Sequence, residues 1–112
     1  MKTFLALYMG SPRPDGRPPE ISDEVRDKGM AAWMDWGRRH VDRIVGIGGP
    51  LGNTKKVSAE GVSDIRNGVA GYVIVQAESH EEAAKVFENH PHFAIFPGES
   101  VEIMEQLPIP GT

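Results

Sequence analysis

The segment 69–77 most constrains what this chain can fold into, because it predicts a strand that is apolar on both faces. Its sequence, VAGYVIVQA, is rich in the β-branched residues that favour an extended backbone. Alternation places Val73 and Val75 on one face of the strand. The opposite face carries Tyr72, Ile74 and Gln76. A sheet built around this strand therefore needs apolar cover on each side.

The remaining elements predict an α+β fold. Residues 2–9 alternate loosely between two apolar faces and predict a second two-sided strand. Ser22 is a good N-cap for a long helix that runs to about Ile44. The later elements are a glycine-rich extended run at 45–52, a short strand at 54–58, a polar turn at 59–68, a helix that begins at the capping box 79–82 and ends before Pro91, and a last strand at 100–107.

The order of these elements is typical of a ferredoxin-like sandwich, in which an antiparallel sheet carries two helices on one face. Four prolines and an Asp-Gly pair in residues 10–20 predict a long loop after the first strand. Because both helices lie on one side, the other face of the sheet stays uncovered in a single copy. We therefore expect a homodimer that pairs through its sheet faces.

Composition limits the classes of function. With 112 residues and 12.3 kDa, the chain fits one domain that spans residues 1–112. The net charge of −4 argues against a nucleic acid or a membrane surface as the partner. The absence of cysteine excludes disulfides, thiol catalysis and thiolate metal sites. The apolar run at the N-terminus is too short for a signal peptide, so we expect a cytoplasmic protein, with no metal and no cofactor.

His40 is the strongest candidate for chemistry. At 100° per residue it shares the apolar sector of the long helix with Trp33 and Trp36. An imidazole in this position is either a general base that works near neutral pH or a hydrogen-bonded core histidine. The two tryptophans likewise either line an aromatic pocket or belong to the core. Together with Tyr8 and His92, these residues line the pocket for a small organic ligand that we expect between helix and sheet.

The remaining motifs are weaker. His90 and His92 flank a proline, and with Glu99 they offer a zinc site only if they share one side of an extended segment. The alternative is structural, with His90 bonding the last carbonyls of the second helix and His92 anchoring the following loop. The glycine run at 46–52 lacks the Lys-Ser/Thr of a phosphate-binding loop, and no Gly-x-Ser-x-Gly elbow is present.

Short motifs follow one another across nearly the whole chain: FLALY at 4–8, WMDW at 33–36, GGPL at 48–51, GYVIVQAES at 71–79, HPH at 90–92 and VEI at 101–103. In their order and spacing they resemble the YCII-related family, which includes the DGPF-type domains. The resemblance implies a dimeric α/β barrel, in which two ferredoxin-like protomers pair their sheets. It also implies a His–Asp pair in the pocket of some members, suspected to be enzymes, and a link to sigma factors in others.

The chain departs from the family pattern at two places. The position of the family's suspected catalytic histidine falls at about Ala32 when the sequences are aligned on Gly49-Pro50. The signature that names the DGPF group is replaced by the polar stretch at 64–68. A His–Asp activity is therefore not carried over to this chain.

Two functional hypotheses follow from the sequence. In the first, a small dimeric protein binds a small organic molecule and transfers a proton through His40. In the second, the chain is a non-catalytic interaction or regulatory domain. A haem- or aromatic-degrading monooxygenase on the same fold would also need a polar set that converges on the pocket.

Overall fold

The computed structural model describes residues 1–10 and 20–111, so the predicted loop at 10–20 lies mostly outside the described residues. The elements, in chain order, are β1 (Lys2–Met9), α1 (Asp23–Arg39), β2 (Ile44–Pro50), β3 (Thr54–Ser58), β4 (Gly61–Ile65), β5 (Val69–Ala77), α2 (His80–Val86), α3 (Pro91–Ala94) and β6 (Ser100–Glu105). The first strand, the short strand at 54–58 and the strand at 69–77 have their predicted bounds.

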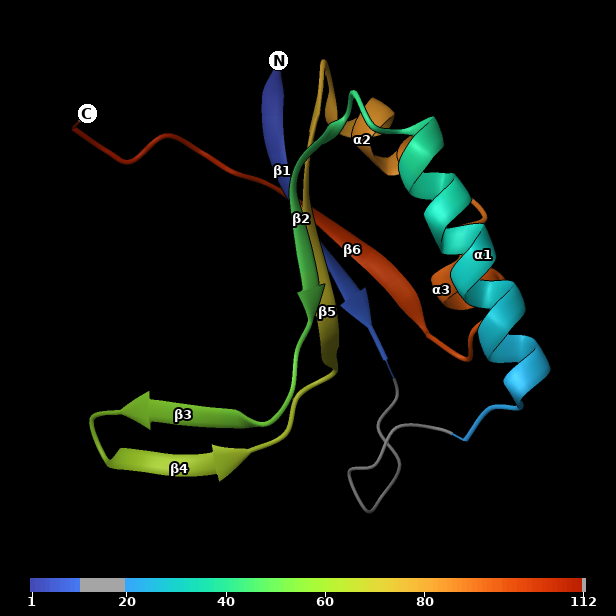
Figure 1. The fold of residues 1–112 in the computed structure, drawn as a ribbon. Helices are drawn as coiled ribbons and strands as arrows, with labels where there is room; N and C mark the ends of the chain where they lie inside the picture. The colour runs from blue at the N-terminus through green and yellow to red at the C-terminus, as the bar shows by residue number, and fades with distance from the viewer. Residues whose placement is uncertain (11–19, 112) are drawn as a thin grey trace.

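Four of the strands form one antiparallel sheet in the order β2-β5-β1-β6, and β3 pairs with β4 in a separate hairpin. β1 lies in the middle, where Ala6 is opposite Val73 of β5 and Ile103 of β6. All three helices cover the same face of this sheet, and the β3-β4 hairpin stands away from it (Figure 1). The predicted α+β ferredoxin-like sandwich is confirmed, because the strand order along the chain is that of the split βαβ fold.

The core lies between the helices and the sheet. Its strand residues are the alternate positions Phe4, Ala6, Tyr8, Val73, Val75 and Ala77, and its helical residues are Trp36, Ala83, Val86 and Phe87. Full burial of one large apolar side chain is worth about 1.5–3 kcal/mol, so this layer supplies most of the stabilisation of the fold. The intervening positions, among them Leu5, Leu7, Tyr72 and Ile74, are half-buried on the open face of the sheet. Both central strands are thus apolar on two faces, as the sequence predicts.

The predicted end of the first helix is wrong. Ser22 is its N-cap and accepts a hydrogen bond from the N–H of Val25, as expected. The helix ends at Arg39, however, and not near Ile44. Residue Ile44 instead pairs with Val75 in the sheet, so tertiary pairing overrides helical periodicity there. None of the helices in the described residues is long and apolar enough to span a membrane.

Three other boundaries differ from the prediction. The polar stretch 59–68 contains a strand, β4, because Gly61 takes a positive φ of 105° that lets the chain turn tightly after Ser58. The second helix ends at Val86, and Pro91 begins the short helix α3 instead of ending α2. The last strand ends at Glu105, two residues before its predicted end.

Candidate functional site

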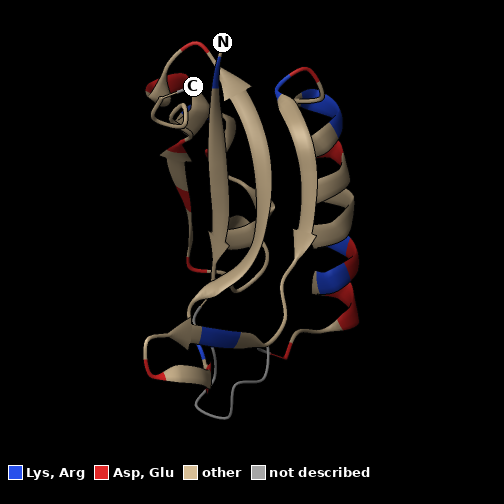
Figure 2. Cartoon of the chain, turned by 90° about the vertical axis from the view of Figure 1, so that its left-hand side faces the viewer, with Lys and Arg blue, Asp and Glu red and all other residues tan. Residues whose placement is uncertain are grey.

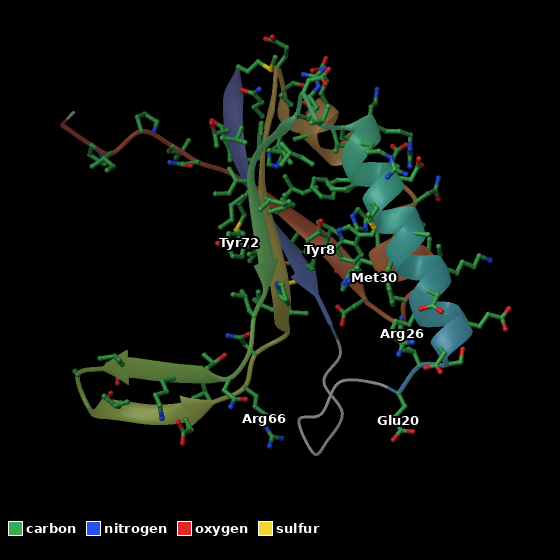
Figure 3. All side chains as sticks on the ribbon, in the orientation of Figure 1. Tyr8, Glu20, Arg26, Met30, Arg66 and Tyr72 are labelled. Atoms are coloured by element: carbon green, nitrogen blue, oxygen red, sulfur yellow. The ribbon has the colours of Figure 1, made fainter. Side chains whose placement is uncertain are left out.

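An aromatic cluster fills the space between β1 and α1. Tyr8 points from β1 towards the helices (Figure 3), and its ring lies 4.8 Å from that of Trp33, 5.1 Å from that of His90 and 5.2 Å from that of His92. The His90 ring in turn lies 4.5 Å from the ring of Trp36. The structure therefore joins residues from β1, α1 and the α3 region into one packed group.

His90 is fully buried, and its hydrogen bonds fix its neutral form. Its Nδ1 accepts a hydrogen bond from the backbone N–H of His92 at 2.9 Å, so Nδ1 carries no hydrogen. The hydrogen must then be on Nε2, which donates to the hydroxyl oxygen of Tyr8 at 3.3 Å. Burial, together with the charges of His92 and His40, lowers the pKa of His90 to about 3, and burial raises the pKa of Tyr8 above its usual value.

His90 does not bond the last carbonyls of α2 with its side chain, as the structural alternative expected, because its side chain caps α3 instead. His92 does anchor the loop, since its Nε2 donates to the carbonyl oxygen of Met9 at 2.7 Å. A Cβ at Gly98 would lie 2.4 Å from His92, so only glycine fits against this imidazole. Within residues 1–10 and 20–111, no group of three or more His, Cys, Asp or Glu side chains could hold a metal ion.

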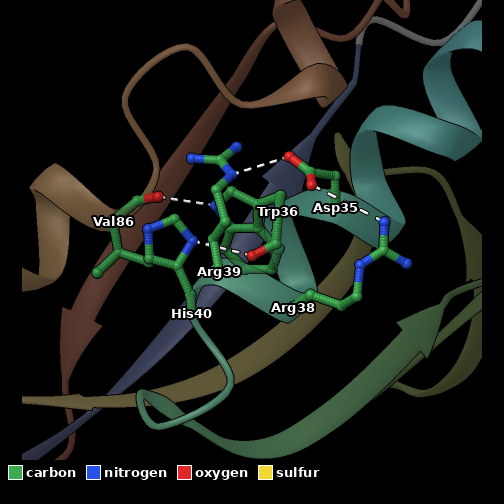
Figure 4. Close-up of polar contacts among 6 residues, drawn as sticks. All are labelled: Asp35, Trp36, Arg38, Arg39, His40 and Val86. Atoms are coloured by element: carbon green, nitrogen blue, oxygen red, sulfur yellow. Dashed lines mark hydrogen bonds and ion pairs between the residues drawn. The ribbon is translucent and has the colours of Figure 1, made fainter.

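The C-terminal end of α1 places Trp36 and His40 side by side (Figure 4). The indole Nε1 of Trp36 donates to the carbonyl oxygen of Val86 at 2.8 Å. The Nδ1 of His40 lies 3.0 Å from the carbonyl oxygen of Trp36, which can only accept, so the hydrogen of a neutral His40 ring is on Nδ1. That assignment leaves Nε2 as the proton-accepting nitrogen, and it has no protein partner among the described residues.

An open cavity of about 230 Å³ lies between the end of α1 and α2. It is lined by His40, Arg43, Glu82, Lys85 and Val86. Glu82 is engaged in the cap of α2, where its carboxylate accepts from the N–H of Glu78. Arg43 contacts the sulfur of Met1, and among the described residues neither Arg43 nor Lys85 forms an ion pair with a carboxylate. The cavity therefore joins a proton acceptor with two cationic groups and the carboxylate of Glu82.

The five residues predicted to line a pocket are brought together, but most of them in a packed core. Tyr8, Trp36 and His92 are each less than a tenth exposed. The Tyr8 ring contacts that of His92, and Tyr8 and Trp36 both contact the ring of His90, whereas His40 lines an open cavity. Sequence reasoning gave His90 only a structural or metal role and missed its contacts with both tryptophans. Gly29 falls in the apolar helical sector that was expected to pack, and a Cβ there would lie 2.4 Å from the ring of Phe96.

The strand order, the layer of helices on one face and the bare opposite face define a ferredoxin-like protomer of the kind found in dimeric α/β barrels. Among solved structures, the chain is similar to the 5-chloro-2-hydroxyhydroquinone dehydrochlorinase of Burkholderia phenoliruptrix AC1100 in complex with 2,5-dihydroxybenzoquinone. The TM-score is 0.57 with 22% identity, and the alignment covers 94% of this chain and 93% of the other. At this identity the similarity concerns the fold. No protein-family model and no curated protein matches the sequence.

Proposed function

We propose that this chain is a YCII-like protein that forms a homodimer through the open face of its sheet and binds a small organic anion in the His40 cavity. The observation that carries the proposal is the state of His40. Its Nδ1 hydrogen is held by the carbonyl of Trp36, so Nε2 is available as a general base beside Arg43 and Lys85.

The open sheet face supports the dimer. Figure 2 looks onto this face and shows it almost free of charged residues along β1, β5 and β2. In a single copy, the described helices all lie on the other side of the sheet and leave this face open (Figure 1). The accessible surface of the chain is 7954 Å², whereas a compact monomer of this mass exposes about 6,100 Å². That excess is larger than the roughly 800 Å² that each partner buries in a standard interface.

The charges around the cavity support an anionic ligand. Arg43 and Lys85 have no carboxylate partner among the described residues, and an organic carboxylate or phenolate would supply one. The cavity volume of about 230 Å³ suits a molecule of about the size of one aromatic ring. The dehydrochlorinase of similar fold is described with a bound dihydroxybenzoquinone, a ligand of this size.

In this proposal the aromatic residues do not contact the ligand but hold His40 and α1 in position. Trp36 holds the His40 ring through its carbonyl oxygen and through a ring contact of 5.3 Å. Tyr8, Trp33 and His92 continue the same packed cluster and keep α1 in place. They are positioning residues, whereas His40 touches the ligand and accepts its proton.

Calorimetric titration with two probes, benzoate and 2,5-dihydroxybenzoquinone, tests the ligand proposal. We expect binding that Arg43→Gln weakens, with Arg39→Gln as a matched control, because Arg39 lies outside the cavity and pairs with Asp35. For a ligand that gives up a proton, titrations in buffers of different ionisation enthalpy should show proton transfer to the protein that His40→Asn removes. If neither probe binds, the non-catalytic interaction domain replaces this proposal.

A further inference from the structure

The β3-β4 hairpin is exposed to solvent on both faces. Within residues 1–10 and 20–111, its strands pair with each other and with no other strand. Nine of its ten strand residues are exposed, and Val57 and Val62, which face each other across the hairpin, are 77% and 67% exposed. The cross-strand ion pair of Lys55 and Asp64, at 2.7 Å, is also in solvent and adds little stability.

An isolated two-stranded hairpin is at best marginally stable in water. Backbone hydrogen bonds hold this one to the body at its base. The N–H of Leu51 donates to the carbonyl of Ala70 at 2.9 Å, and the N–H of Gly10 donates to that of Gly68 at 2.7 Å. A hairpin that is fixed at its base and exposes valines further along its strands is suited to pack against another molecule.

The direction in which the hairpin projects indicates which partner it contacts. It projects to the side of the sheet opposite the helices, which is the side on which the proposed second copy sits (Figure 1). The radius of gyration is 15.7 Å, whereas a compact chain of this length has about 13 Å, and the hairpin is one of the segments that extend beyond the sheet and helices (Figure 1). The excess surface of the single chain also leaves area for an interface wider than the sheet face alone.

We propose that the β3-β4 hairpin is an arm that grips a second copy of this chain, with its Val57/Val62 face packed against the partner. This inference rests on the proposed sheet-paired dimer and extends it. Alternation places Lys55 and Asp64 beside the two valines and places Lys56 and Ser63 on the other face of the hairpin. The arm therefore has an apolar centre on one face, whereas the centre of the other face is polar and its apolar residue, Ile65, lies at the base of the hairpin.

Crosslinking from a single introduced cysteine tests the arm, because the chain has no cysteine of its own. The Val57→Cys protein is labelled with a benzophenone maleimide, and isotopically light and heavy chains are mixed. Irradiation should then give a covalent dimer whose crosslinked peptides join a light chain to a heavy chain. Lys56→Cys, on the opposite face of the hairpin, is the matched control and should crosslink at least about fivefold less.

The outcomes separate the arm from the dimer on which it rests. If the unmodified protein is a dimer but labelled Val57→Cys gives no intermolecular product, the arm is wrong and the sheet-paired dimer stands. If the unmodified protein is a monomer, both fail. As a second measurement, Val57→Lys with Val62→Lys should raise the dissociation constant of the dimer by at least about tenfold, whereas Lys56→Thr with Ser63→Thr should leave it unchanged.

Discussion

The Nε2 of His90 lies 3.3 Å from the hydroxyl oxygen of Tyr8, although 82 positions separate the two residues in the chain. The contact ties the segment before α3 to the centre of the sheet. Because the Nδ1 of His90 accepts from the N–H of His92, both ring nitrogens are satisfied only while the ring is neutral. The pair makes the fold sensitive to acid and to the loss of a single hydroxyl group.

The stability of the protein should fall as the pH falls from about 7 towards 4. The pKa of His90 is about 3 in the folded state against 6.5 in the unfolded chain, so between these values the unfolded chain binds more protons. The free energy of unfolding that depends on a neutral His90 is therefore fully present above pH 6.5 and is lost progressively below it. The loss is at most about 1.4 kcal/mol for each unit by which folding lowers the pKa of His90. Urea unfolding at a series of pH values should show this slope, and His90→Gln should be less stable at pH 7 but flatter with pH. Equal slopes in the two proteins would contradict the prediction, as would NMR signals of a charged His90 ring in folded protein above pH 5.

Tyr8→Phe should destabilise the protein by about 1–3 kcal/mol, because it leaves the buried Nε2–H of His90 without an acceptor. Denaturant unfolding at pH 7 measures the loss. Ser63→Ala is the control, since it removes an exposed hydroxyl group outside the cluster, and it should change stability by less than about 0.5 kcal/mol. A Tyr8 variant as stable as the control would show that the hydroxyl contributes nothing to the cluster.

Gly29→Ala should destabilise the fold even though alanine favours helices by about 1 kcal/mol over glycine. A Cβ at this position of α1 would lie 2.4 Å from the ring of Phe96, so the ring must move. Gly37→Ala, in the same helix with nothing within 4 Å of its Cβ, should be neutral or stabilising. Thermal unfolding should give a lower midpoint temperature for Gly29→Ala and an unchanged or higher one for Gly37→Ala. The double variant Gly29→Ala with Phe96→Leu should recover part of the loss if the clash is the cause.

Ile74→Lys should convert the dimer into a monomer. The side chain lies on the open face of the sheet, where a second copy would bury it, and an unpaired buried charge is costly. Light scattering after gel filtration gives the mass, and circular dichroism shows that the fold persists. Met34→Lys, on the exposed side of α1 at 61% exposure, should remain a dimer. A dimeric Ile74→Lys protein would place the interface elsewhere.

The fold could be predicted from the sequence because its signals are local. Alternation in 2–9 and 69–77 gave the two central strands, and the caps Ser22 and Ser79 gave both helix starts. The end of α1 could not be predicted, because residues 40–43 keep a helical pattern and only pairing with β5 draws Ile44 into the sheet.

The candidate site was only partly predictable. Periodicity placed Trp33, Trp36 and His40 on one side of the helix. In the structure Trp36 belongs to the core and Trp33 packs against it, whereas His40 lies beside Trp36 at the helix end and lines the open cavity. The sequence did not indicate how fully the rings would fill the space between helix and sheet. That depends on Gly29 and Gly98, which bring Phe96 and His92 within reach of the cluster, and such close approaches follow from tertiary packing.

The place of β1 in the sheet has a consequence for how the chain acquires its structure. Residues 2–9 pair on one side with 69–77 and on the other with 100–105, so β1 is synthesised well before either of its partner strands. Contacts between such distant segments slow folding, since the long intervening loop must close before any pairing repays its entropy. We therefore expect the complete sheet to form only after β6 has been synthesised, with an apolar β1 exposed until then to chaperones or to other nascent chains.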